Sequence, residues 1–469
     1  MSDEVCRLPL AEVAAKIRAK ELSALEVARA CVQRAERLQS TLTLFISLDA
    51  ERALASARAA DADAAAGRWR GPLHGVPVAH KDQFYRRGRI VSCGSRLRAD
   101  FRPGYTATLL ERLDAAGAVD LGGLNMSEFA CNPYGLNVLV GRARNPWNPD
   151  FIAGGSSSGS AAAVAAAAVF GSFGSDTGGS VRLPAAICGV VGLLPTNGRI
   201  SRHGMMPLSF SLDNAGPLAR TARDCARLLA CVAGHDPLDP ASSARPAEDY
   251  EAGLARPLRG RRIAVPKRHY YEHCSAEVRT ALSKSLAVFE RGGAALVEVE
   301  VPDPRPLDAL GNVLILAEAA TIHAPLLRAR AADYTPLVRS RIEFGFSFSA
   351  QQYIEALNLR ASRLASFVET VFARADALHL PMLAHAVPSM AEVEAGFAGQ
   401  TDLSFNLAAN TRSINYLGLP SLAMPCGSSA NGLPIAFQLV GAPFAEATLL
   451  NLGHQYEQAA GAAPLPPLH

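Results

Sequence analysis

The sequence predicts a single α/β domain with a helical insertion. Hydrophobic residues make up 49% of the 469 positions, so the chain can bury a large core. Residues 262–265 and 294–301 have strand composition, and helical spacing of apolar residues at 276–291 separates them. This β-α-β order implies parallel pairing. No internal repeat and no low-complexity linker divides the chain, so one domain is expected over residues 1–469.

The first elements are two amphipathic helices within residues 10–38, interrupted near Ser23, whose hydroxyl suits an N-cap. A short strand is expected at 44–48 and an alanine-rich helix at 53–66. Two glycines and two prolines then break the pattern before a short strand that ends at Lys81. A strand end is a position where a rigid scaffold often holds catalytic groups.

Gly- and Ser-rich loops dominate residues 117–216, where short apolar strands and one alanine-rich helix alternate with tight turns. After the β-α-β unit, residues 307–375 read as mostly helical. The chain closes with the segment 417–425, a Ser-Ser-Ala-Asn-Gly turn, a strand at 434–440 and a final helix at 445–458.

Composition excludes several classes of function. The 46 Lys and Arg residues nearly balance 43 Asp and Glu residues, which argues against a nucleic-acid or anionic-membrane partner. Nine cysteines without a repeating CxxC pattern argue against a disulfide framework or a structural zinc site. The acidic start lacks signal-peptide features, and the longest uniformly apolar run, 161–170, is too short to span a bilayer. A cytoplasmic location is therefore expected.

Two Gly/Ser loops carry the strongest functional signal. They are Gly154-Gly-Ser-Ser-Ser-Gly-Ser160 and Gly174-Ser-Asp-Thr-Gly-Gly-Ser180-Val-Arg-Leu-Pro184, and Gly75-Val-Pro-Val-Ala-His-Lys81-Asp82 precedes them. Together they resemble the amidase signature family. Further segments match in the family's order: Asn125-Met-Ser-Glu-Phe129, Asn145-Pro-Trp-Asn148, Leu212-Asp-Asn-Ala-Gly-Pro217, Gly418-Leu-Pro-Ser-Leu-Ala-Met-Pro425 and Gly432-Leu-Pro-Ile-Ala-Phe-Gln438.

The resemblance implies a central mixed β-sheet sandwiched by helices, with the signature core at about 70–230 and a variable, mostly helical, substrate-side segment at about 309–411. It also implies hydrolysis of a carboxamide C–N bond through an acyl-enzyme, without cofactor or metal. The family uses a Ser-Ser-Lys triad. Its motifs place the nucleophile at Ser180, the relay serine at Ser156 and the general base at Lys81.

Elementary chemistry supports these roles. A serine hydroxyl is a weak nucleophile until a base removes its proton, and lysine is a base only when neutral. Burial without a close carboxylate lowers a lysine pKa because desolvation penalises the ammonium form. Neutral Lys81 would accept a proton from Ser156, which takes the proton of Ser180. In reverse, the same groups protonate the leaving amine.

The nucleophile loop also suits an oxyanion hole, because a tight glycine loop exposes backbone N–H groups. Its successive donors are Thr177, Gly178, Gly179 and Ser180. Pro184 fits the first turn of a following helix whose positive end should point near the oxyanion. By resemblance, Asp176 and Arg182 brace the loop, and a cis peptide joins Gly155 to Ser156.

Several local motifs suggest other chemistry. Gly155-Ser-Ser157-Ser-Gly159 matches a nucleophile elbow, but its preceding residues cannot form the buried strand that an elbow requires; Ser157 is expected to support Ser156 by a hydrogen bond. His269-Tyr-Tyr-Glu-His273 matches an inverted zinc motif, which works only on one helix face, and a loop is the better interpretation. His80 is expected to pack away from the site and Cys188 to be a core thiol.

The expected partner is a small-molecule amide, and a homodimer is left open. The alternative is the A subunit of a glutamine-dependent tRNA amidotransferase, which releases ammonia from glutamine for a partner protein. The sequence after Gly135 lacks the Thr-Glu-Asn-Ser-Ala-Phe pattern usual in that enzyme, which weakens this alternative. An apolar substrate pocket is predicted in the variable segment, and its candidate residues are Tyr334, Phe344, Phe346 and Phe348.

Overall fold

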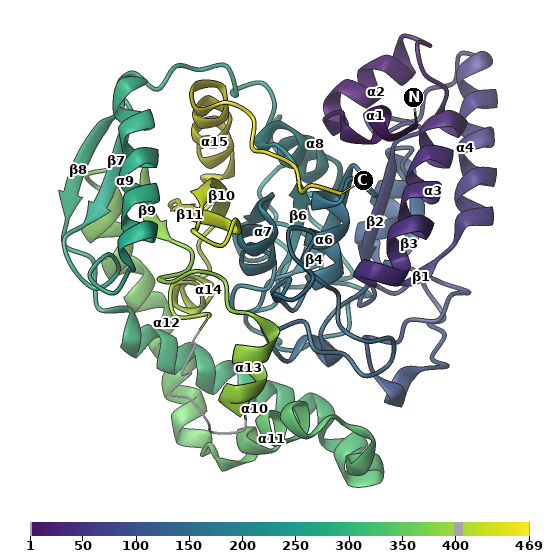
Figure 1. The fold of residues 1–469 in the computed structure, drawn as a ribbon. Coiled ribbons are helices and arrows are strands. Elements are labelled where there is room, and N and C mark those ends of the chain that lie inside the picture. The colour runs from purple at the N-terminus through teal and green to yellow at the C-terminus, as the bar shows by residue number, and fades with distance from the viewer. Residues whose placement is uncertain (1, 398–406, 469) are drawn as a thin grey trace.

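The computed structural model describes residues 2–397 and 407–468, and in them eleven strands form one continuous mixed sheet (Figure 1). The strand order across the sheet is β1-β3-β2-β4-β6-β5-β10-β11-β9-β7-β8. The strands are β1 (Phe45–Leu48), β2 (Pro77–Lys81), β3 (Val119–Leu124), β4 (Gly171–Ser175), β5 (Val191–Leu194), β6 (Ala215–Ala219), β7 (Arg262–Pro266), β8 (Ala295–Val299), β9 (Ala377–Pro381), β10 (Ser421–Ser428) and β11 (Pro434–Val440).

The sheet has two parallel regions joined by antiparallel strands. Strand β2 lies parallel to β3 and β4, and β7 lies parallel to β8 and β9. The remaining pairs are antiparallel. The predicted single α/β domain with a mixed sheet is therefore confirmed, as is the parallel pairing of β7 and β8 across helix α9 (Ala276–Arg291).

Helices cover the sheet and form an additional layer at one end. They are α1 (Ser2–Arg7), α2 (Leu10–Arg18), α3 (Ala24–Leu42), α4 (Ala50–Ala65), α5 (Thr108–Ala115), α6 (Ser158–Ala165), α7 (Arg182–Cys188), α8 (Ala222–Val232), α9 (Ala276–Arg291), α10 (Pro304–Arg330), α11 (Pro336–Phe344), α12 (Ala350–Phe367), α13 (Met390–Phe397), α14 (Arg412–Leu417) and α15 (Glu446–Ala460). The break between α2 and α3 falls at Ser23, which caps α3 with a capping box to Glu26.

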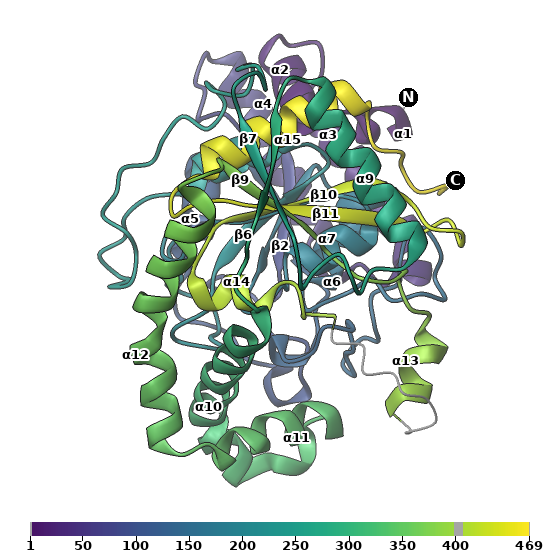
Figure 2. The ribbon, with the colours of Figure 1, turned by 90° about the vertical axis from the view of Figure 1, so that its left-hand side faces the viewer.

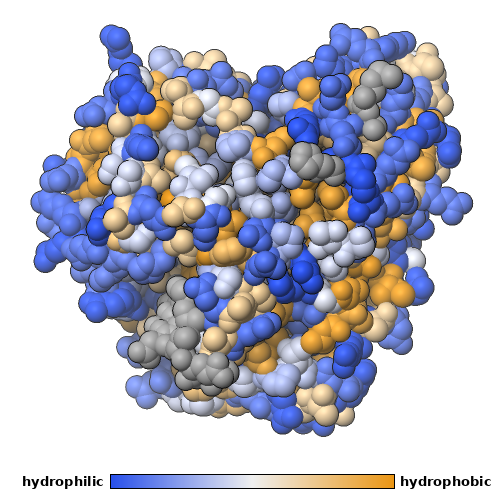
Figure 3. Space-filling model, viewed as in Figure 1, coloured by the Kyte–Doolittle hydropathy of each residue, from blue (hydrophilic) through white to orange (hydrophobic). Residues whose placement is uncertain are grey.

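Both faces of the central strands are covered. Helix α7 packs on β10 from one side and α15 packs on it from the other (Figure 2). Helix α7 is short and wholly buried, and α8 packs on β5 and β6. Apolar side chains fill the core between the sheet and these helices. Hydrophilic side chains cover much of the face shown in Figure 3.

Helices α10, α11 and α12 project together from one end of the sheet (Figures 1 and 2). The helical stretch Pro304–Asp333 is long and apolar enough to cross a membrane by length and composition. It packs on α11, α12 and α14, however, and buries Glu318 and His323 with hydrogen-bond partners. Core helices of globular proteins pass the same test, so this is weak evidence for a membrane span.

The segment 417–425 is divided between a helix and a strand. Leu417 ends helix α14, and strand β10 begins only at Ser421. Gly418 adopts a φ of 71°, the left-handed conformation typical of a residue that terminates a helix. The apolar run before it is buried on a helix, so hydrophobicity alone did not distinguish the two structures.

Candidate active site

Parallel pairing of β2 and β4 brings two polar side chains together at the carboxyl ends of these neighbouring strands. Lys81 is the last residue of β2 and Ser175 the last of β4. Lys81 Nζ lies 2.7 Å from Ser156 Oγ and 2.8 Å from Ser175 Oγ. Ser175 Oγ in turn donates to Gln83 Oε1 at 2.8 Å. Ser175 and Gln83 were not predicted from the sequence, although the position of Ser175 at the end of its strand was a usable signal.

Lys81 is fully buried, with 0% of its surface exposed. Burial lowers the pKa of Lys81 from 10.5 to about 7, and the charges of Asp213 and Asp176 only partly oppose this fall. Within the described ranges, no carboxylate lies within ion-pair distance of its Nζ. A substantial neutral fraction is therefore present near neutral pH.

Ser156 and Ser157 lie between β3 and β4, just before α6 begins at Ser158. Ser156 is buried and follows the cis Gly155-Ser156 peptide, as the resemblance implied. Ser157 does not support Ser156 as expected. Its hydroxyl instead donates to the Ser175 carbonyl and accepts from the Ser175 N–H, both at 3.2 Å, which braces the end of β4.

Ser180 lines a cavity of about 310 Å³ and is partly exposed. The Ser157 N–H donates to the Ser180 carbonyl at 3.2 Å, so the two serine loops are in direct contact. In the part of the chain that the structure describes, the hydroxyls of Ser156 and Ser180 form no hydrogen bond with each other. The structure therefore brings Lys81 and Ser156 into contact, and it joins Ser180 to the same loop through the backbone of Ser157.

One of the four expected oxyanion donors is engaged elsewhere. The Gly179 N–H donates to Asp176 Oδ1 at 2.7 Å, so it does not face the cavity as a free donor. The N–H groups of Thr177, Gly178 and Ser180 have no acceptor among the described residues. The set of available donors is thus smaller than predicted, because a carboxylate at the start of the loop needs an N–H partner when buried.

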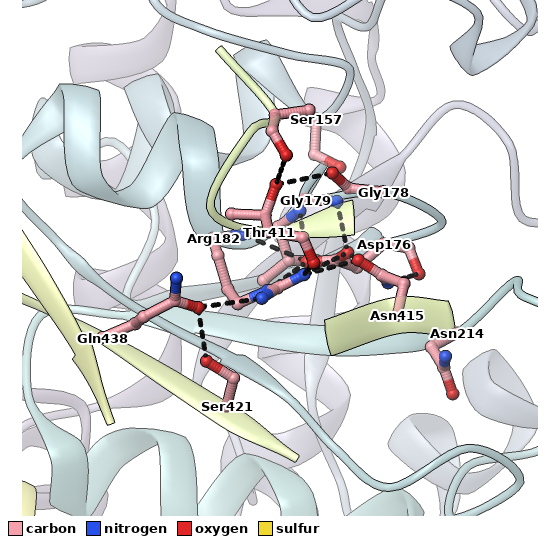
Figure 4. A network of polar contacts seen from close by, with 12 residues as sticks. Ser157, Asp176, Gly178, Gly179, Arg182, Asn214, Thr411, Asn415, Ser421 and Gln438 are labelled. Carbon is pink, nitrogen blue, oxygen red and sulfur yellow. Dashed lines mark hydrogen bonds and ion pairs between the residues drawn. The ribbon is translucent and has the colours of Figure 1, made fainter. Parts of the chain in front are cut away.

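Asp176 and Arg182 form the brace of this loop, and both side chains are 0% exposed. Arg182 Nε lies 3.0 Å from Asp176 Oδ2. Arg182 also donates to Asn415 Oδ1 at 2.6 Å and to Gln438 Oε1 at 2.9 Å (Figure 4). The pKa of Asp176 is lowered although desolvation raises it, because Arg182 and several hydrogen bonds favour the carboxylate. Arg182 therefore ties the 174–184 loop to two C-terminal elements.

The cavity above Ser180 is lined by both apolar and cationic side chains. Leu183, Leu208 and Ile315 are apolar, whereas Arg341 and Arg412 are cationic. Arg412 pairs with Asp308 at 2.8 Å, but Arg341 Nε has no hydrogen-bond partner in the described residues.

The predicted aromatic lining is wrong. Phe344 and Phe346 are 56% and 58% exposed at the end of α11, and Phe348 packs against Phe344 there. Tyr334 is buried and hydrogen-bonds His323 at 2.8 Å. The sequence shows several aromatic residues close together, but it does not show which of their side chains point into the cavity.

The remaining motifs lie outside this site. His269 and His273 lie in bends and turns before α9 rather than on one helix, so the inverted zinc-protease geometry does not form. His80 points to Asp120, 3.6 Å away, and not toward Ser156. Cys188 is a buried core thiol whose pKa is raised by burial.

The fold, the two serine loops and the buried lysine together indicate an amide hydrolase. Comparison with known proteins supports this class. The chain belongs to the amidase family, whose model matches residues 26–450. It is 39% identical to the A subunit of glutamyl-tRNA(Gln) amidotransferase from Anaeromyxobacter sp. (strain K), over 99% of this chain and 98% of that protein.

Solved structures agree with the fold over its whole length. Native peptide amidase from Stenotrophomonas maltophilia is 30% identical with a TM-score of 0.87, over 98% of each chain. 6-Aminohexanoate cyclic dimer hydrolase in complex with substrate is 26% identical with a TM-score of 0.89, over 99% of each chain. The chain is thus an amide hydrolase of this family.

Proposed function

We propose that the chain hydrolyses a carboxamide C–N bond through an acyl-enzyme, with Ser180 as nucleophile, Ser156 as relay and Lys81 as general base. The observation that carries this proposal is the buried Lys81 amine, 2.7 Å from Ser156 Oγ and without a carboxylate partner among the described residues. Ser180, whose carbonyl accepts from the Ser157 N–H, lines a cavity. A lysine whose pKa is lowered to about 7 is suited to accept a proton near neutral pH.

In the acylation step, neutral Lys81 accepts the Ser156 proton while Ser156 accepts the Ser180 proton. Ser180 Oγ then forms a bond to the substrate carbonyl carbon. Collapse of the tetrahedral intermediate breaks the C–N bond, and the proton returns through Ser156 to the leaving nitrogen. Water then attacks the acyl carbon while Ser156 and Lys81 accept its proton. The bond from the acyl carbon to Ser180 Oγ breaks, the proton returns to Oγ, and the carboxylic acid is released.

The oxyanion is expected to accept from N–H groups of Thr177, Gly178 and Ser180, which have no other acceptor in the described structure. Asp176, Arg182 and Ser157 support the loop and do not react. In this proposal, residues 70–230 supply the reacting groups, and the 309–411 segment supplies substrate-side walls that include Ile315 and Arg341.

The test is labelling with a fluorophosphonate probe, followed by peptide mass spectrometry of the adduct. We expect one adduct, on Ser180, that is lost in Ser180→Ala and kept in Ser160→Ala, a buried serine of α6 outside the cavity. An adduct on another residue, or none on the folded wild-type chain, would contradict the assignment.

For the biological setting, the curated relatives favour the A subunit of the amidotransferase over a stand-alone amidase. The identity to that protein is 39% and covers nearly the full length of both chains. The cavity agrees, because Arg341 beside Ser180 suits a substrate with a carboxylate, such as glutamine. We therefore propose glutamine as the first substrate to test, a partner protein that accepts the ammonia, and the cytoplasm as location. A homodimer belongs to the stand-alone alternative.

A further inference from the structure

The mostly helical segment carries a buried carboxylate that binds the 208–213 turn rather than facing solvent. Glu318 of α10 is 2% exposed. Its Oε2 accepts from the Ser209 hydroxyl and from the Ser211 N–H at 3.0 Å, and its Oε1 accepts from the Ser211 hydroxyl and from Tyr353 OH at 2.9 Å. No cation lies within ion-pair distance of it in residues 2–397 and 407–468. A buried carboxylate is tolerated when donors satisfy it in this way.

The turn that Glu318 holds also holds the nucleophile loop. Asp213 Oδ2 accepts from the N–H groups of Leu208 at 2.8 Å and Ser209 at 3.0 Å. Its other oxygen, Oδ1, accepts from the Thr177 hydroxyl at 2.5 Å. Ser209 therefore links two carboxylates: its hydroxyl donates to Glu318 and its backbone N–H donates to Asp213. Asp213 in turn accepts from the Thr177 hydroxyl.

Both ends of this network meet the same cavity. Ile315 lies one helical turn before Glu318, and Leu208 precedes Ser209. Both side chains line the cavity that contains Thr177 and Ser180. A shift of α10 relative to the 208–213 turn would thus move two cavity walls and the anchor of Thr177 together.

We propose that Glu318 is a positioning residue for the acylation step: it locks α10 to the 208–213 turn, and through Ser209 and Asp213 it fixes the backbone donors at Thr177 and Gly178. The inference rests on the proposed function, because it assigns Glu318 a role in reactivity of Ser180. Oxyanion donors act only when they are preorganised, so a small displacement lowers the rate more than it weakens binding.

The experiment measures the maximal rate of fluorophosphonate labelling and the half-saturating probe concentration. Glu318→Leu removes the acceptor at similar size and should lower the maximal rate about ten- to a hundredfold, with the half-saturating concentration changed by less than about threefold. Glu318→Gln should stay within about threefold of wild type, because its amide oxygen replaces Oε2 and its NH₂ can donate to a hydroxyl.

The matched control is Glu446→Leu, which removes another buried glutamate. Glu446 is 1% exposed and accepts from the Thr196 N–H at 2.7 Å, away from the cavity. This variant should lose stability but keep the labelling rate. Wild-type rates in folded Glu318→Leu, equal losses in Glu318→Leu and Glu318→Gln, or an equal loss in Glu446→Leu would overturn the proposal.

A second variant keeps the test decisive where Glu318→Leu does not fold. The double variant Ser209→Ala/Ser211→Ala removes both hydroxyls that join Glu318 to the turn and leaves both backbone donors to Asp213 in place. We expect a rate about fivefold lower or more; a folded variant at the wild-type rate would overturn the inference. Failure of the proposed function would give a different result, because the wild-type chain itself would then carry no adduct on Ser180.

Discussion

Lys81 is the residue at which stability and activity oppose each other. It is the last residue of a buried strand. Three of its features were predicted from the sequence: its motif, its position at a strand end, and the burial that lowers its pKa. Its second partner, Ser175, was not predicted, because contact between two strand ends depends on their parallel pairing. The same limit applies to Gly179, whose N–H is engaged by a carboxylate three residues earlier.

Replacing Lys81 by methionine should stabilise the fold while abolishing amide hydrolysis. The folded pKa of about 7 lies below the ordinary 10.5, so the unfolded chain binds more protons between these values. Wild-type stability should therefore rise with pH through this window, and Lys81→Met should lack that rise. At pH 7 we expect a gain of roughly 1–4 kcal/mol in the free energy of unfolding, as when other buried charges are replaced.

Urea unfolding at pH 7 and at pH 9.5 measures the difference between the two proteins. The advantage of Lys81→Met should be largest at pH 7 and smaller at pH 9.5. A constant difference across both pH values would mean that Lys81 keeps its charge in the folded chain.

At the scale of elements, the site follows from where strands end and helices begin. Strands β2 and β4 deliver Lys81 and Ser175, and the two serine loops lead into α6 and α7. The sequence predicted most of these elements because strand composition, N-caps and glycine punctuation are local signals. The partners of Arg182 were not predictable, since Asn415 and Gln438 lie on elements more than 230 positions later.

Removing the Arg182 side chain should destabilise these elements together. Arg182→Met leaves Asp176 buried without its cation, which should cost roughly 3–5 kcal/mol of unfolding free energy. Arg305→Met is the control, because Arg305 also pairs with an aspartate but is 84% exposed. Thermal unfolding of both variants decides the point. Equal losses of Tm, or none in Arg182→Met, would contradict the bracing role.

At the scale of the whole molecule, residues from both halves of the chain meet at the site. The N-terminal half supplies the Lys81–Ser156 contact and Ser180, and the projecting helices supply Ile315 and Arg341, which line the cavity with Ser180. The sequence predicted this division between a Gly/Ser-rich core and a helical segment, and the sheet order explains why neither half forms the site alone.

Glutamine hydrolysis should depend on Arg341 and on a partner protein. Ammonia release from glutamine by the chain alone and with the other amidotransferase subunits is the measurement, and the partners should raise it. Arg341→Gln should lower kcat/KM for glutamine roughly tenfold more than for an uncharged amide, because it removes a charge-assisted contact. Full activity on uncharged amides without a partner, and none on glutamine with one, would favour the stand-alone amidase.

The most direct test of the central claim compares an amide with its ester in Lys81→Ala. An amine leaving group must be protonated before it can depart, whereas an alkoxide leaving group depends less on protonation. If neutral Lys81 is the base that works through Ser156, Lys81→Ala should lose amide turnover at least roughly tenfold more than ester turnover, and Ser180→Ala should lose both. An equal loss of ester and amide turnover in Lys81→Ala, with the fold intact by circular dichroism, would contradict the account and limit Lys81 to shaping the site.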